Sequence, residues 1–205
     1  MSRLFNLDNP VWRFVGNLAD LFLLSILWYL CCIPVFTLGT GTAAMYYVTL
    51  KMASNQEGYT FSSFVKSFKQ NFKPATLIWL IFLAIGLVLA VDFHWSMNAG
   101  NLFSTAMFLP FAVVAVLYLL CLALIFPLVA RCDNTIKTTI GMCFAMSVRN
   151  FLPVLSTIMV TAAFFGVGLF IFWPLLLLAP GLSAYINSFI FNRILAKYHF
   201  DLPNE

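Results

Sequence analysis

Long stretches without charged side chains dominate the chain. No Asp, Glu, Lys or Arg occurs at 21–50, 75–91, 93–130 or 150–192. A transmembrane helix needs about 20 mainly apolar residues. The pattern therefore predicts an all-α, polytopic helix bundle that crosses a membrane several times.

Two of the apolar stretches are too long for one crossing. The stretch 150–192 is interrupted at Trp173-Pro174 and again at Pro180-Gly181, and such residues favour a turn between two helices. The first run, 18–51, is either one long helix followed by a surface segment or a hairpin that turns near Ile33-Pro34.

The positions of the basic residues favour the hairpin, because short cytoplasmic loops collect Lys and Arg. A single first crossing leaves Arg3 and Arg13 outside, whereas six crossings place all eleven Lys and Arg on the cytoplasmic side. We expect the segment that carries Arg3 and Arg13 to be retained rather than cleaved as a signal peptide. The chain is thus predicted to be one multi-pass membrane domain, 1–205, with both termini cytoplasmic. Its spans lie at about 16–33, 35–51, 75–92, 105–130, 152–172 and 175–193.

Composition supports a membrane protein and excludes two other classes. Hydrophobic residues make up 62% and charged residues 9% of the chain, against about 45–50% and about 25% in soluble domains. A water-soluble enzyme could not cover its surface with so few charges, and a disordered chain would hold fewer apolar residues. The net charge of +4 is scattered along the sequence, so we expect contact with the bilayer and no binding of nucleic acid.

An amphipathic helix is predicted at 60–73, just before the third span. Its apolar side chains recur at steps of three and four, which places them on one face, while its lysines fall largely on other faces. We expect the apolar stripe to enter the inner membrane interface and the lysines to face anionic headgroups. The helix then serves either as an anchor or as a docking helix for a partner. The residues concerned are Phe61, Phe64, Val65, Phe68 and Phe72, and Lys66, Lys69 and Lys73.

Small residues recur four apart in two spans, where they allow membrane helices to approach closely. They serve either packing within the bundle or an interface between subunits of an oligomer. The candidates are Gly39, Gly41, Ala43, Gly181 and Ala184.

The sequence offers little catalytic chemistry. Asp92 and His94 form an acid–histidine neighbourhood, but it is too small for a metal or acid–base site. The five cysteines lack the spacing of a zinc or redox site, and Asp20 is the single candidate for a functional charge within the membrane. We therefore expect no enzyme activity, no cofactor and no metal.

One part of the chain carries a more specific pattern. Cys32-Ile-Pro-Val-Phe-Thr-Leu-Gly39, Thr42-Ala43 and Tyr46-Tyr47 resemble the signature of the YesL-like family of bacterial membrane proteins. The similarity is specific over 9–80 and general beyond. The family is a domain of unknown function whose members are typically encoded beside carbohydrate-degrading enzymes and ABC-type sugar importers. The resemblance implies a bacterial cytoplasmic membrane and a role in sugar uptake, and it carries over no catalytic residue. The pattern continues in Gly58, Phe61, Phe64, Phe68 and Asn71-Phe72-Lys73.

These observations predict a non-catalytic accessory subunit of a bacterial ABC-type carbohydrate importer. It would contribute helix surface to the permease, and the segment 60–73 would dock on the permease or the ATPase subunits. Two alternatives stay open: a self-contained transporter or facilitator for a small solute, and a membrane scaffold or regulator of a sensor protein. A polar path through the bundle would favour the transporter.

Overall fold

The computed structural model describes residues 10–56, 58–98, 102–132 and 135–198. All regular structure in these ranges is helical, which confirms the predicted all-α bundle. The elements are α1 (Pro10–Cys32), the 3₁₀ turn η1 (Val35–Thr37), α2 (Leu38–Ala53), α3 (Thr60–Asn98), α4 (Leu102–Arg131), α5 (Ile136–Arg149), α6 (Phe151–Phe170) and α7 (Pro174–Lys197).

Five of these helices, α1, α3, α4, α6 and α7, are long and apolar enough to cross a membrane, and they place the chain in a lipid bilayer. Helix α2 has 16 residues, or about 24 Å at 1.5 Å per residue, against about 30 Å for the hydrocarbon core. The number of crossings therefore stays a prediction. Both chain ends, 1–9 and 199–205, lie outside the described residues, and their cytoplasmic location also stays a prediction.

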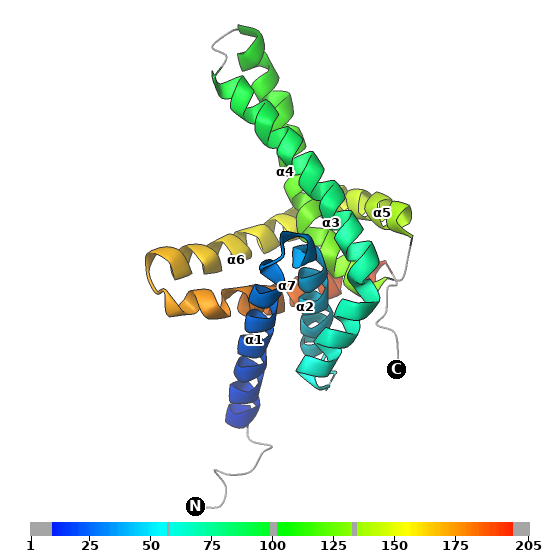
Figure 1. Ribbon diagram of the computed structural model, residues 1–205, viewed down its shortest axis with the longest axis vertical. Coiled ribbons are helices and arrows are strands. Elements are labelled where there is room, and N and C mark those ends of the chain that lie inside the picture. Colours follow the sequence, from blue (N-terminus) through cyan, green and yellow to red (C-terminus); the bar gives the residue numbers. More distant parts are fainter. Residues whose placement is uncertain (1–9, 57, 99–101, 133–134, 199–205) are drawn as a thin grey trace, which may run out of the picture.

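Helix α2 lies at the centre of the molecule (Figure 1). Residues 43–50 are all buried, because α1, α3, α4 and α7 pack around the helix. A helix on the surface of a bundle shows one buried stripe, whereas α2 is buried on almost every side. The short central helix thus connects the rest of the fold.

The first apolar run forms two helices separated by a turn at 33–37. The Thr37 hydroxyl donates hydrogen bonds to the carbonyls of Cys31 and Pro34, at 2.6 and 2.8 Å. The indole N–H of Trp79 on α3 donates to the Val35 carbonyl at 2.8 Å. Hydrogen bonds from Thr37 within the turn and from Trp79 on α3 therefore hold the turn in place.

The expected break between a surface helix at 60–73 and a span at 75–92 is wrong, because α3 is one helix of 39 residues with Pro74 inside it. Proline removes one intrahelical hydrogen bond, but contacts with α2 support the same turn. The hydroxyl of Thr40 lies 2.9 Å from that of Thr76, and Ala75 is fully buried. The interfacial position of 60–73 stays a prediction.

The phenylalanine stripe of α3 was expected to face lipid, but part of it faces the protein core. Phe64 is only 3% exposed and belongs to the protein core, whereas Phe61 is 56% exposed. The face that packs on the bundle is mixed in character and therefore lacks a purely apolar signature. It consists of Thr60, Phe64, Ser67, Asn71, Ala75, Ile78 and Phe82.

Two long hairpins extend from the core in different directions (Figure 1). Helices α3 and α4 form one, drawn in green at the top, and α6 and α7 form the other, drawn in yellow and orange. Helix α5 packs on α4 and leads into α6. The divergence leaves a space between α4 and α6 above the central helix α2.

Candidate functional site

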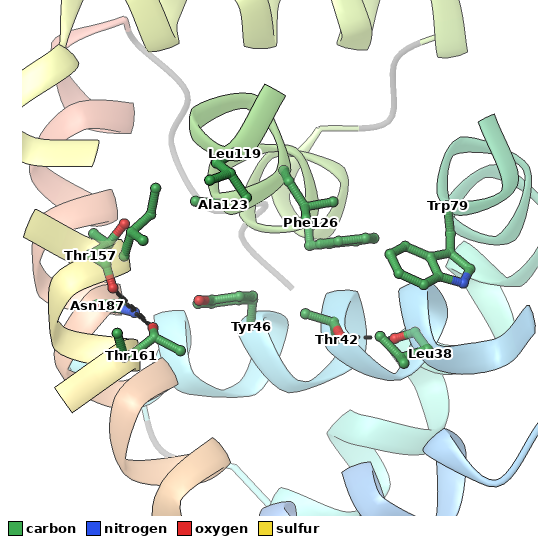
Figure 2. Close-up of a pocket in the computed structure, with 13 residues that line it drawn as sticks. Leu38, Thr42, Tyr46, Trp79, Leu119, Ala123, Phe126, Thr157, Thr161 and Asn187 are labelled. Atoms are coloured by element: carbon green, nitrogen blue, oxygen red, sulfur yellow. Dashed lines mark hydrogen bonds between the residues drawn. The ribbon is translucent and has the colours of Figure 1, made fainter. Parts of the chain in front are cut away.

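A cavity of about 430 Å³ lies where the two hairpins diverge (Figure 2). Helix α2 contributes residues four apart, so that one of its faces forms a wall, and α4 and α6 supply most of the rest. The lining residues are Leu38, Thr42 and Tyr46 of α2, Trp79 of α3, Leu119, Leu122, Ala123 and Phe126 of α4, Thr157, Ile158, Thr161 and Ala162 of α6, and Asn187 of α7.

One end of the cavity is polar, and Asn187 forms it. This side chain is 1% exposed. Its Nδ2 donates to the Thr157 carbonyl at 3.3 Å and to the Thr161 hydroxyl at 2.9 Å. Its Oδ1 is buried and has no hydrogen-bond partner within the described part of the chain. The hydroxyl of Tyr46 points toward this end (Figure 2).

The other polar groups of the lining are already paired. Thr42 donates to the Leu38 carbonyl at 2.8 Å and accepts from the Trp28 indole at 3.0 Å. The hydroxyls of Thr157 and Thr161 donate to carbonyls of α6, at 2.7 and 2.9 Å. Among the residues that the structure describes, no charged side chain lines the cavity, so it suits a neutral and mainly apolar occupant.

The described residues hold no cluster of three or more His, Cys, Asp or Glu that could bind a metal. On α3, His94 is exposed and Asp92 is half-buried. None of the five cysteines, all of which lie among the described residues, forms a disulfide, and the Cys143 thiol donates to the Cys121 carbonyl at 3.2 Å. None of these groups lines the cavity.

The small residues lie at close contacts within this chain. A Cβ atom added to Gly41 would lie 2.6 Å from Cβ of Cys31, and one added to Gly39 would lie 2.5 Å from Cβ of Trp79. Ala43 and Ala184 are 0% and 1% exposed. They pack inside the bundle, and these positions offer no open surface for a second subunit.

Gly181 belongs to a contact that the sequence did not suggest. Helix α7 runs through Pro180 instead of turning there, so the predicted second interruption is wrong. The backbone N–H of Gly181 donates to the Ser25 hydroxyl on α1 at 3.0 Å. Ser25 and Tyr29 are four residues apart and share one face of α1, but nothing in the sequence pairs this face with α7.

A second polar cluster lies at the opposite end of α2, toward the predicted cytoplasmic side. Arg131 Nη1 donates to Oδ1 of Asn192 at 2.7 Å. Asn192 Nδ2 donates to the Leu50 carbonyl and to the Ser54 hydroxyl, at 3.2 and 3.0 Å. The last turns of α2, α4 and α7 are thereby joined. The lysines of the 60–73 segment, Lys66, Lys69 and Lys73, are all exposed.

Part of the chain is similar to a known protein family. Residues 21–93 match a family model described as "Protein of unknown function, DUF624". The YesL-like family, which the chain resembles, is a DUF624 family. No curated protein and no solved structure matched the chain. The chain is therefore similar to the DUF624 family from within α1 to near the end of α3.

Proposed function

We propose that the protein is a non-catalytic integral membrane accessory subunit, and that its partner is the permease of a bacterial ABC-type carbohydrate importer. The divergence of the two hairpins carries this proposal, because it leaves apolar faces of the described helices exposed. Val91 on α3 is 68% exposed, and Phe170 and Ile171 at the end of α6 are 90% and 78% exposed. Such faces suit packing against the helices of another membrane protein.

The interior supports a role without independent transport. Buried hydroxyls donate to carbonyls of their own helices, as Thr49 does to Met45 at 3.1 Å and Ser188 does to Ala184 at 2.7 Å. A group that already donates within its helix is poorly placed to bind a passing solute. The resemblance to YesL-like proteins suggests the importer as the partner. The exposed lysines of 60–73 suit docking on a cytoplasmic subunit of that importer.

A facilitator for a small solute is the second candidate, and the cavity at Asn187 favours it. A monosaccharide carries several hydroxyl groups, each of which needs a partner when buried. The Tyr46 hydroxyl points toward the polar end of the cavity (Figure 2), but the Asn187 carbonyl oxygen is fully buried and the other polar groups of the lining are paired. The accessory role therefore agrees better with the chemistry of the interior.

Copurification with a defined permease tests the proposal. The tagged chain is coexpressed with the importer permease, extracted in a mild detergent, and the recovered permease is quantified by mass spectrometry. We expect stable recovery with the wild type, and reduced recovery when Leu87 and Val91, or Phe170 and Ile171, are changed to Ser. Leu152→Ser is the matched control, since Leu152 is 76% exposed but lies at the other end of α6.

A flux assay separates the two candidates. The purified chain alone, in liposomes loaded with radiolabelled sugar, should give no flux above that of empty liposomes. Saturable and stereospecific flux would replace the accessory subunit with a facilitator. Equal permease recovery with all variants and with an unrelated membrane protein would remove the importer from the proposal.

A further inference from the structure

We infer that the groove between the beginning of α6 and the end of α7 binds the phosphate headgroup of an anionic membrane phospholipid, with Arg193 and Lys197 as its cationic partners. The inference goes beyond the proposed accessory role and does not depend on the identity of the partner protein. It rests on the charge of the groove, on its volume and on its depth in the bilayer.

Two basic side chains of α7 line the groove. Arg193 and Lys197 are four residues apart, so they share one face of the helix, and both are exposed. The acidic residues of the described ranges are Asp20 and Asp92, and neither lines the groove. The described lining therefore carries a net positive charge, which favours an anionic ligand. A guanidinium group also matches the geometry of phosphate oxygens, with which it forms paired hydrogen bonds.

The beginning of α6 forms the opposite wall and adds to this charge. Helix α6 starts without a hydrogen bond from a capping side chain. The amide of Asn150, which lines the groove, donates instead to the Tyr198 hydroxyl at 3.1 Å. Because the first N–H groups of a helix have no acceptor within the helix, its beginning carries positive partial charge. This partial charge has the same sign as the side chains of Arg193 and Lys197.

The groove is large enough for a lipid headgroup. Its volume is about 380 Å³, which falls within the range of roughly 300–1,000 Å³ of small-molecule sites. Part of its lining is apolar: Pro153 comes from α6, and Ile190 lies one turn before Arg193 on α7. The groove thus offers cationic and apolar contacts next to each other.

The depth of the groove selects a phospholipid over a soluble anion. Arg193 is the first charged residue after the uncharged stretch 150–192, and both α6 and α7 are long and apolar enough to cross a membrane. Arg193 therefore lies where α7 leaves the hydrocarbon, at the level of the headgroups. A phospholipid places its phosphate beside Arg193 and Lys197 and its first methylene groups beside Ile190. Basic pockets between membrane helices are typical sites for anionic headgroups.

Native mass spectrometry with a matched pair of lipids tests the inference. The full-length protein in a mild detergent is incubated with equal amounts of phosphatidylglycerol and phosphatidylcholine that carry the same acyl chains. The two lipids differ in net charge, and we expect the wild type to retain more phosphatidylglycerol. From the usual contribution of one basic side chain near an anionic leaflet, Arg193→Gln and Lys197→Gln should each lower the ratio of retained phosphatidylglycerol to phosphatidylcholine about fivefold.

Matched variants separate the groove from the rest of the surface. Arg149→Gln is the control for charge, since Arg149 is exposed beside the beginning of α6 but does not line the groove. Ser156→Trp should reduce retention of phosphatidylglycerol, because the ring fills the groove while both basic residues remain. Leu152→Trp is its control, since Leu152 is exposed on the same helix outside the lining. All these positions are exposed, so the substitutions leave the core intact.

Four results would overturn the inference. Equal retention of the two lipids by the wild type would mean that the protein does not select a negative charge. Equal loss with Arg149→Gln and Arg193→Gln would mean that the overall charge of this end attracts the lipid. Equal retention by the two tryptophan variants would place the lipid outside the groove. Displacement of phosphatidylglycerol by an excess of glycerol 3-phosphate would assign the groove to a soluble phosphate ester.

Discussion

The backbone N–H of Gly181 on α7 donates a hydrogen bond to the hydroxyl of Ser25 on α1, at 3.0 Å. One turn away, the Tyr29 hydroxyl donates to the Leu176 carbonyl at 2.7 Å. Leu176 lies four residues before Pro180, so its carbonyl is the one that the missing proline N–H leaves free. Two side chains of α1 thus complete the hydrogen bonding of α7 at its proline.

Removing the Tyr29 hydroxyl should destabilise the fold. In Tyr29→Phe the partly buried Leu176 carbonyl loses its donor, and leaving such a group unpaired costs up to about 1–3 kcal/mol. We expect a lower melting temperature of the purified protein in detergent. Phe22→Leu, an exposed position on α1, is the control that should leave the melting temperature unchanged. An unchanged melting temperature for Tyr29→Phe would mean that this bond contributes nothing to stability.

Two glycine substitutions should have opposite effects. A Cβ at Gly181 would collide with the Leu21 carbonyl oxygen and lie 2.7 Å from the Ser25 hydroxyl, so Gly181→Ala forces α1 and α7 apart. Overpacking of this kind costs about 1–3 kcal/mol. Gly166 on α6 has no atom within 4 Å of an added Cβ, and alanine there gains up to about 1 kcal/mol in helix propensity. Thermal unfolding of the two variants should show shifts of opposite sign, and equal shifts would contradict the packing of α1 on α7.

The phenylalanines of α3 should differ in importance. Phe64→Ala should cost about 3–5 kcal/mol, because it opens a cavity in the core. Phe61→Ala should cost far less, since that ring is 56% exposed. Protease resistance of the two variants in inverted vesicles provides the measurement. A larger effect for Phe61 would mean that the outer stripe, through lipid or a partner, holds this segment.

Thiol labelling should distinguish two cysteines near α5. Cys143 is 0% exposed, and its hydrogen bond with Cys121, together with burial, raises the pKa of its thiol. Because the thiolate is the reactive form, a raised pKa means less reactive thiol at any given pH. We expect maleimide at pH 8 to modify the half-buried Cys132, with Cys143 modified only after denaturation. Peptide mapping of the native protein checks this, and rapid modification of Cys143 would contradict its burial.

Topology reporters can settle the number of crossings. We expect fusions after Glu57 and after Asn134 to behave as cytoplasmic and insertions within 98–101 as external. An external signal after Glu57 together with a cytoplasmic N-terminus would mean that α1 and α2 cross the membrane once between them.

The features of the fold that depend on one local stretch of sequence were predicted correctly. Length without charge is a local property, so the all-α membrane bundle was predicted correctly from runs such as 150–192. The proline positions were misjudged, because a local rule treats Pro74 and Pro180 as breaks. In the fold, Thr40 packs beside the first, and Ser25 and Tyr29 supply donors at the second.

The cavity could not be predicted for a related reason. Asn187 is one polar residue in a long apolar stretch, and its significance depends on α6, which fixes its amide, and on α2, which brings Tyr46 near. The stripe of α3 had the correct period, but periodicity alone does not say which face meets protein and which meets lipid.

The enclosed position of α2 also constrains how the chain is made. Three of the four helices around it, α3, α4 and α7, emerge from the ribosome after it does. While they are missing, a helix of 16 residues with glycines and threonines at its beginning has neither the length nor the neighbours of a stable span. We therefore expect α2 to stay beside the insertion machinery until synthesis reaches the C-terminal hairpin, and we expect quality-control proteases to degrade a truncated chain that lacks α7.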